Sequence, residues 1–309
     1  MDISGLVDMV SSFFFQFQGI LVRELPREST STINCLVALT NAWAVGDSAG
    51  HVSVFDLQCK RLLRTYRHGH PVYTVASFGE NGFMCNAGHG FWVWNNHKSR
   101  RVPGEDENCI FKLVSFPDGL AASCSKLNGE VHVYDLHGAS TFLHILLGPG
   151  RVSDIVECGD RLASVHETED AAFNIAVQLW DARRGTIVHT VQLQCPFIYN
   201  VISIEHSLVF IDPQLRVHVH DLETGHQDVV AMTYRLCAIP DGRVLITSVV
   251  DDTFQTVELP SVSARPSARL SAPPDNTKDT SEPRGICWML YSPAGFIVSC
   301  RYNKISVWK

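Results

Sequence analysis

Several features that mark other protein classes are missing from this sequence. Its ten cysteines are dispersed singly with no Cys-x-x-Cys pair, so zinc ribbons and thioredoxin-like redox motifs have no support. No Asn-x-Ser/Thr glycosylation sequon occurs, and the first residues lack the basic start of a signal peptide. No apolar run is long enough to span a membrane. We therefore expect a cytoplasmic protein with reduced thiols and no membrane contact, with the nucleus as an alternative location.

Charge is sparse and its balance is acidic. Only 18% of the 309 residues are charged, and 25 Lys and Arg stand against 32 Asp and Glu, for a net charge of −7. This balance argues against a nucleic-acid partner bound through a broad basic surface, although it leaves a local basic patch open. The hydrophobic fraction of 45% is typical of a soluble globular protein with a large core.

Sequence motifs of common catalytic sites are also missing. There is no GxSxG, no P-loop and no GxGxxG. The stretch His166–Asp170 combines one histidine with three carboxylates, but on a hairpin tip such side chains usually point apart into water rather than toward one metal ion. We predict that the protein is not an enzyme and holds no cofactor and no metal.

An internal repeat dominates what is present. The stretch HVSVFDL at 51–57 alternates apolar and polar residues and ends in an aromatic residue followed by Asp. Clear copies are EVHVYDL at 130–136, AVQLWDA at 176–182 and RVHVHDL at 216–222, and weaker ones lie at 90–96, 253–259 and 304–309. Successive copies are 39, 40, 46, 40, 37 and 51 residues apart, and a period near forty predicts a repeat architecture.

Each repeat reads as four strands, of which the recurring stretch is the third. The last repeat ends after its third strand, and an unassigned strand, GILVREL, lies at 19–25 before the first repeat. That early strand can complete the last sheet, which would close the sheets into a ring and remove an open edge. We predict an all-β fold, a seven-bladed β-propeller of four-stranded antiparallel blades over 19–309, closed by the N-terminal strand.

The chain resembles the WD-repeat β-propeller family over about residues 19–309. The strand endings VFDL, VYDL and LWDA are similar to the family's Trp-Asp signature, and Gly69-His70 is similar to its Gly-His dipeptide. Among these strand endings, only Trp180-Asp181 has the exact Trp-Asp dipeptide. No repeat shows the family's full His–Ser–Asp–Trp tetrad. The resemblance implies a non-enzymatic scaffold that binds other proteins.

Residues 1–18 stand outside the repeats. The spacing of their apolar residues, which include Phe13, Phe14 and Phe17, predicts an amphipathic helix. The helix could pack on its own domain, or it could offer its Phe face to a groove in a partner. Insertions at 165–174 and 260–284 interrupt the period, and the second is rich in Pro, Ser and charge, so we expect a mobile loop whose ordering on binding stays open.

One end of a propeller collects the loops that join successive repeats and the loops between second and third strands. In the family that loop face is the usual partner-binding surface. We expect the following basic and aromatic residues there: His70, Tyr73, His89, Lys126, Arg151, His166, Tyr199, Arg235, Arg284, Arg301 and Tyr302. Because arginine grips carboxylates and phosphates through two hydrogen bonds, acidic or phosphorylated protein segments are the expected partners. The alternative is that these cations are ordinary exposed loop residues.

Three further groups of residues have a structural and a functional reading. Lys60, Arg61, Arg64 and Arg67 cluster on an outermost strand, where charge keeps an edge soluble and could also contact acidic protein or RNA. His218 and His220 alternate with valines, and we treat both as structural. The innermost strands carry few acids, namely Asp154, Glu157 and Glu205, so a catalytic carboxylate cluster is not expected.

Three functions compete. The leading one is a propeller subunit of an intracellular complex, which binds partners through its loop face and its N-terminal helix. The second is a substrate receptor of a cullin–RING ubiquitin ligase, because Trp180–Arg183 fits the WDxR ending that resembles such receptors. The third is a propeller hydrolase, which would require carboxylates or a metal in the central channel. Nothing in the sequence indicates a homo-oligomer.

Overall fold

A computed structural model describes the strands and most of the turns between them. The described residues are 15–17, 21–24, 31–39, 41–58, 61–79, 82–86, 90–95, 98–103, 110–125, 129–137, 141–168, 175–233, 235–239, 243–247, 254–259, 288–292, 296–301 and 304–308. They contain no helix, and therefore none that could cross a membrane.

The described strands form seven four-stranded antiparallel sheets. The first strands are β3 (Ile33–Ala38), β7 (Val75–Phe78), β11 (Ile110–Ser115), β15 (Gly150–Cys158), β19 (Tyr199–Ile204), β23 (Leu236–Ala238) and β26 (Trp288–Ser292). The second strands are β4 (Ala42–Asp47), β8 (Gly82–Asn86), β12 (Leu120–Ser125), β16 (Arg161–Thr168), β20 (Ser207–Ile211), β24 (Arg243–Thr247) and β27 (Phe296–Arg301).

The third strands contain the recurring stretch. They are β5 (His51–Asp56), β9 (Phe91–Asn95), β13 (Glu130–Asp135), β17 (Ile175–Asp181), β21 (Arg216–Asp221), β25 (Phe254–Glu258) and β28 (Lys304–Trp308). The fourth, outer strands are β6 (Leu62–Arg67), β10 (Lys98–Val102), β14 (Thr141–Leu147), β18 (Thr186–Leu193) and β22 (Gln227–Met232), together with β1 (Phe15–Phe17) and β2 (Leu21–Glu24) in the two remaining sheets.

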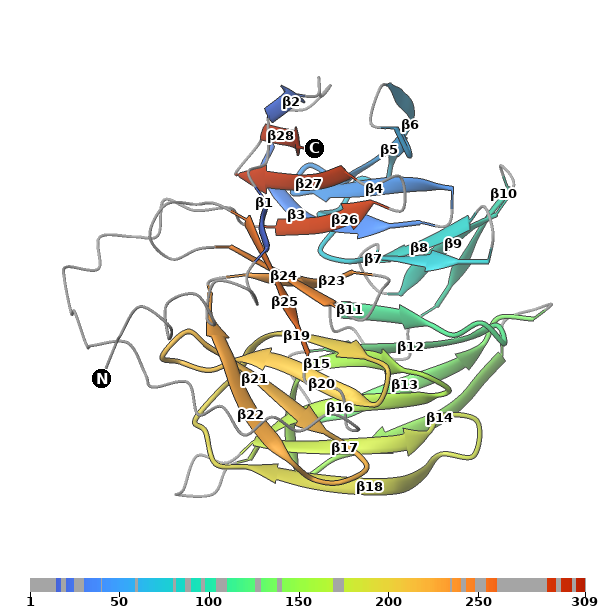
Figure 1. Ribbon diagram of the computed structural model, residues 1–309. Helices are drawn as coiled ribbons and strands as arrows, with labels where there is room; N and C mark the ends of the chain where they lie inside the picture. The colour runs from blue at the N-terminus through green and yellow to red at the C-terminus, as the bar shows by residue number, and fades with distance from the viewer. Residues whose placement is uncertain are drawn as a thin grey trace, which may run out of the picture.

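The first strands of neighbouring sheets contact one another around the middle of the molecule (Figure 1). The last of them, β26, contacts β3, so the sheets form a ring about a central axis. This is the architecture of a β-propeller.

Apolar side chains pack between the faces of neighbouring sheets. Six hydrophobic clusters are present in the described part of the chain, and each joins two adjacent sheets. Trp43 and Phe55, for example, are fully buried and stacked with ring centroids 4.3 Å apart. Burying one such side chain is worth about 1.5–3 kcal/mol, so these clusters hold the ring together.

The predicted fold class, a seven-bladed propeller closed by one N-terminal strand and preceded by a helix, is wrong in that form. Part of the predicted helix is instead strand β1, which pairs with β25 in the register Phe15↔Thr256 and Phe17↔Phe254. Two sheets, not one, therefore take their outer strand from the N-terminal segment. The predicted pairing of the early strand with the end of the chain is present, because β2 pairs with β28 in the register Leu21↔Trp308.

The aspartate that ends the recurring stretch has a structural role. Its side-chain Oδ1 accepts hydrogen bonds from backbone N–H groups in the turn that follows: Asp56 from Arg61 at 3.2 Å, Asp135 from His137 at 2.8 Å, Asp181 from Arg184 at 2.9 Å, and Asp221 from Glu223 at 2.9 Å and Thr224 at 2.7 Å. These bonds fix the turn into the outer strand, which explains why the residue recurs with the period of the sheet.

Candidate interaction surfaces

Topology defines two ends of the ring. Strands alternate in direction within each sheet, so the connections between sheets and the turns between second and third strands lie at one end, which we call the loop face. The turns between first and second strands and between third and fourth strands lie at the other end, which we call the turn face. The residues predicted from sequence distribute over both.

On the loop face, the structure leaves His70, Tyr73, Arg151 and Tyr199 exposed and Arg235 half-buried. For Phe17 and Arg301 it defines the backbone alone, in β1 and β27. Outside the described residues lie His89, Lys126, Arg284, Tyr302, Phe13 and Phe14, together with the 260–284 insertion.

Hydrogen bonds with the Asn86 side chain hold the backbone of the loop that contains Tyr73. Asn86 at the end of β8 is buried, and its Oδ1 accepts hydrogen bonds from the N–H groups of Tyr73 at 2.7 Å and Thr74 at 3.0 Å. Its Nδ2 donates to the carbonyl of Pro71 at 3.2 Å. The backbone is therefore fixed while the Tyr73 ring remains 45% exposed.

A second exposed aromatic residue, Phe197, was missed by the sequence reading. It precedes Tyr199 in the connection from β18 to β19, and the two rings meet edge to face with centroids 5.0 Å apart. Phe197 is 38% and Tyr199 is 46% exposed. Asn200 beside them has a left-handed backbone with a φ of 49°, and its Nδ2 donates to the Leu236 carbonyl at 2.7 Å, which fixes the pair against the neighbouring sheet. Two aromatic residues, separated by a single residue just after an outer strand, were the sequence signal that could have indicated this exposed pair.

His166 does not belong to a surface. It lies within β16 and is fully buried, rather than at a hairpin tip. The indole Nε1 of Trp180 donates to Ser164 Oγ at 2.7 Å, and Ser164 Oγ lies 2.7 Å from His166 Nε2, while His166 Nδ1 lies 3.4 Å from the Gly150 carbonyl. Burial lowers the pKa of His166, although the Gly150 carbonyl opposes this. The residue is a core histidine that links β16 to the start of β15 and, through Ser164, to Trp180 on β17.

Two of the acids predicted on innermost strands have defined surroundings. Asp154 on β15 forms an ion pair with Lys112 on β11, with Oδ1 and Nζ 3.0 Å apart. Burial alone would lower the pKa of Lys112, but the Asp154 carboxylate outweighs it and raises the pKa. The pair ties two neighbouring sheets at their inner strands. Burial and the nearby Asp118 raise the pKa of Glu157.

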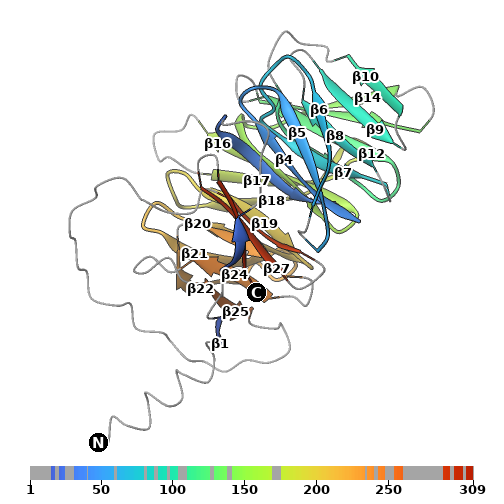
Figure 2. The same ribbon diagram turned by 90° about the horizontal axis from the view of Figure 1, so that it is seen from above.

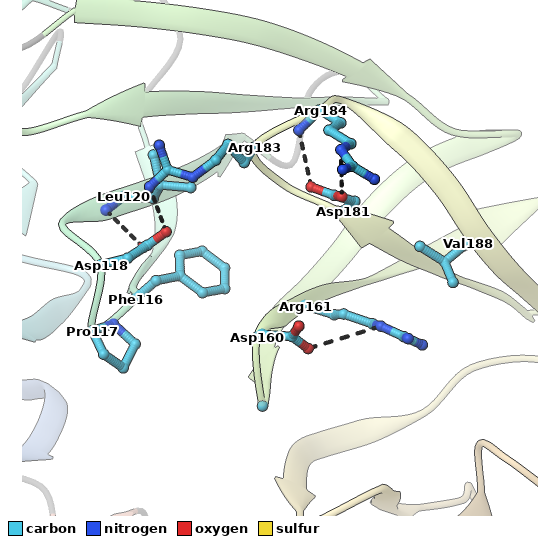
Figure 3. A pocket seen from close by; sticks show the side chains of 11 residues that line it. Phe116, Pro117, Asp118, Leu120, Asp160, Arg161, Asp181, Arg183, Arg184 and Val188 are labelled. Atoms are coloured by element: carbon cyan, nitrogen blue, oxygen red, sulfur yellow. Dashed lines mark hydrogen bonds and ion pairs between the residues drawn. The ribbon is translucent and has the colours of Figure 1, made fainter.

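The turn face carries a pocket of about 680 Å³ between the sheets of β11–β14 and β15–β18. Three ion pairs line it (Figure 3): Arg183 with Asp118 at 2.6 Å, Arg184 with Asp181 at 3.6 Å, and Arg161 with Asp160 at 3.9 Å. Phe116, Leu120 and Val188 supply apolar walls. Arg183, the last residue of the WDxR stretch, therefore lies at this end and its pKa is raised by Asp118. Within the described residues no group of three or more His, Cys, Asp or Glu could hold a metal ion.

Comparison with known proteins supports the fold. No family model matches this chain, and no curated protein matches it in sequence. Among solved structures it is similar to the β-propeller domain of Cps50 (Swd1) from Myceliophteria thermophila, with a TM-score of 0.66 and 12% identity, over 94% of this chain and 99% of that one. At that identity the similarity shows the propeller fold.

Proposed function

We propose that this protein is a non-enzymatic interaction scaffold that binds segments of partner proteins on its loop face. The observation that supports this most is the exposed pair Phe197 and Tyr199, held on a fixed backbone. Aromatic residues are enriched at protein interfaces because they bury much area at little entropic cost, and leaving two of them in water is unfavourable.

Cations on neighbouring sheets favour an acidic or phosphorylated segment as the partner. Arg151 begins β15, and Arg235 immediately precedes β23 on the far side of the aromatic pair. Guanidinium groups bind carboxylate and phosphate through paired hydrogen bonds, while the aromatic pair would receive an apolar side chain of the same segment. The propeller suits this role because its sheets fix loops that can vary in sequence without cost to the core.

Affinity purification of the tagged full-length protein from its own cells, followed by quantitative mass spectrometry, tests the proposal. The double variant Phe197→Ser/Tyr199→Ser should lose its specific partners by about 10-fold or more, as expected for removal of a binding hot spot. Ile145→Ser/Leu147→Ser is the matched control, because these residues are 43% and 66% exposed on outer strand β14. Retention of all partners by the first variant, or equal loss in the control, would contradict the proposal.

The receptor role in a cullin–RING ubiquitin ligase remains a separate prediction, tied to Arg183 on the turn face. Arg183→Ala would abolish copurification of the cullin adaptor if that role holds, and it would leave partners of the loop face unchanged.

A further inference from the structure

Positive charge is concentrated in one part of this acidic chain. Residues 31–103, which build the sheets of β3–β6 and β7–β10, contain seven Lys and Arg and three Asp and Glu, for a net charge of +4. Because the whole chain carries −7, the rest carries −11. The potential around the molecule is therefore strongly asymmetric.

The cations gather on two outer strands. Arg64 and Arg67 lie on β6, and Lys98, Arg100 and Arg101 lie on β10. In contrast, β14 and β18 contain no Lys, Arg, Asp or Glu, and β22 contains Asp228 alone. Charge that only protects an exposed edge from aggregation would be needed on β14 and β18 as well, so edge protection does not explain the distribution.

Strand register shows which of these side chains share a space. Arg64 is directly opposite Val54, and Arg101 is directly opposite Trp92. Val54 and Trp92 both belong to the hydrophobic cluster between the two sheets, so Arg64 and Arg101 project from the two sheet faces that meet. Arg100 is on the opposite face of β10, where its guanidinium donates to the Leu136 carbonyl of the next sheet. The strands β6 and β10 are the outer strands of two neighbouring sheets, whose first strands β3 and β7 contact each other (Figures 1 and 2).

Half-buried aromatic rings project from the same two sheet faces as Arg64 and Arg101. Tyr66 lies 4.4 Å from Trp94 between ring centroids, and His68 lies 6.2 Å from Trp92 and 5.7 Å from Trp94. Tyr66, His68 and Trp92 are all half-buried. The rings pack on each other, which gives a continuous apolar strip rather than separate open faces.

We propose that this β6–β10 seam, formed by Arg64, Tyr66, His68, Trp92 and Arg101, is a docking site for an acidic segment of a partner protein. Carboxylates of the segment contact Arg64 and Arg101, and an apolar side chain of the segment covers the strip at Tyr66 and Trp92. Arg67, which is opposite His51, lies on the other face of β6 and adds only to the local positive potential. The charge complementarity that carries the proposal is local, since a positive seam is surrounded by a negative remainder. The site meets the loop face only at His68, which begins the connection from β6 to β7, and it shares no residue with the Phe197 and Tyr199 pair. The proposal therefore stands or falls independently of the function proposed above.

The same observations favour protein over single-stranded nucleic acid. Bases bind by stacking on open aromatic faces, whereas these rings are already packed against one another. A nucleic-acid strand longer than the seam would also place its phosphates against the acidic remainder of the surface, which would repel them.

Fluorescence anisotropy of the full-length protein with labelled ten-residue probes tests the proposal. The probes are a glutamate peptide with a central phenylalanine, the corresponding lysine peptide and a ten-nucleotide oligouridylate. We expect the glutamate peptide to bind, with an affinity that falls as salt rises. The variant Arg64→Glu/Arg101→Glu should bind it at least about 10-fold more weakly, because like charges then face each other.

The control is Arg161→Glu/Arg184→Glu, which makes the same change in net charge at exposed arginines of another sheet, outside both the seam and the loop face. It should alter binding by less than about 2-fold at moderate salt. Hydrogen–deuterium exchange of the wild-type protein with and without the glutamate peptide gives a readout that does not depend on the folding of the variants, and bound peptide should slow exchange in β6 and β10. Equal weakening in both double variants, protection confined to other sheets, or oligouridylate binding as tight as peptide binding would overturn the proposal.

Discussion

Replacement of Asp212 by alanine should be among the most destabilising single changes in this protein. Asp212 is 1% exposed at the turn between β20 and β21. Its Oδ1 accepts from the N–H groups of Gln214 and Arg216, each at 2.9 Å. Its Oδ2 accepts from Arg216 Nε at 2.7 Å and from His218 Nε2 at 2.8 Å.

The imidazole of His218 is part of the same network. Gln227 Nε2 donates to His218 Nδ1 at 2.7 Å, so the ring proton is on Nε2 and points to Asp212. The ring also stacks on Phe210, with centroids 5.1 Å apart and an interplanar angle of 4°. Loss of the carboxylate would therefore leave the His218 Nε2–H group without an acceptor, and the stack on Phe210 prevents the ring from rotating toward another one.

The magnitude follows from these partners. Each buried donor left without an acceptor costs about 1–3 kcal/mol; the His218 donor is buried, and the N–H groups of Gln214 and Arg216 make part-buried hydrogen bonds, so each of these costs less. Arg216 is 48% exposed and can be rehydrated, so its ion pair contributes about 0–1 kcal/mol. Partial relaxation of the turn lowers the total, and we expect Asp212→Ala to reduce the free energy of unfolding by about 3–5 kcal/mol.

Urea unfolding followed by far-UV circular dichroism measures this loss. Asp160→Ala is the control, because Asp160 is 95% exposed, and it should cost less than about 0.5 kcal/mol. Burial alone would raise the pKa of Asp212, but hydrogen bonds from His218 and Arg216 lower it below its ordinary value. The stabilisation is therefore complete above the unfolded pKa of about 3.9 and is lost as pH falls through the folded value. A loss below about 1 kcal/mol at pH 7, or a loss that grows below pH 4, would refute the reasoning.

Three further predictions concern packing, acid stability and the chain start. Gly148→Ala should destabilise by about 1–3 kcal/mol in urea titration, since a Cβ there would lie 1.9 Å from the His166 ring, whereas Gly159→Ala would meet no neighbouring atom and would test backbone strain alone. Burial lowers the pKa of His68 to about 4, so stability should fall as pH drops from about 6.5 toward 4, and His68→Asn should make unfolding free energies between pH 7 and 5 vary less. Deletion of residues 1–18 removes β1 and should promote aggregation through the uncovered edge of β25, measured by light scattering against a full-length control; a monodisperse truncated protein would contradict this.

The repeat was readable from sequence because one strand in each sheet has a strong pattern. The apolar residues of HVSVFDL and its copies alternate with the period of a strand, and the terminal Asp fixes the next turn, so pattern and turn chemistry agree. The pairing of β2 with β28 could also be predicted, since it follows from one unassigned strand at the start and one missing strand at the end.

The strand β1 could not be predicted in this way. It has three residues, Phe15–Phe17, which is too short to show alternation, and the surrounding apolar residues are spaced as on a helix. Pairing with β25 depends on a contact about 240 residues away along the chain, and local periodicity has no information about it.

The surface residues divide in the same manner. Tyr73 and Tyr199 are exposed at the end of the ring where the topology collects the connections between sheets, whereas their role in binding stays a prediction. His166 was misplaced because a histidine among acids looks solvated in sequence, whereas its burial depends on Ser164 and Trp180 in three dimensions. The charge asymmetry between the early sheets and the rest was present in the sequence, but strand register was needed to show which arginines share a face.

The dual use of the N-terminal segment has a consequence for biosynthesis. Residues 15–24 are synthesised before the other described strands, whereas their hydrogen-bonding partners on β25 and β28 are synthesised only after the five intervening sheets. Those five sheets can form from contiguous segments as the chain emerges, but the other two need a contact across most of the described chain. We expect closure of this long loop to limit the rate of folding.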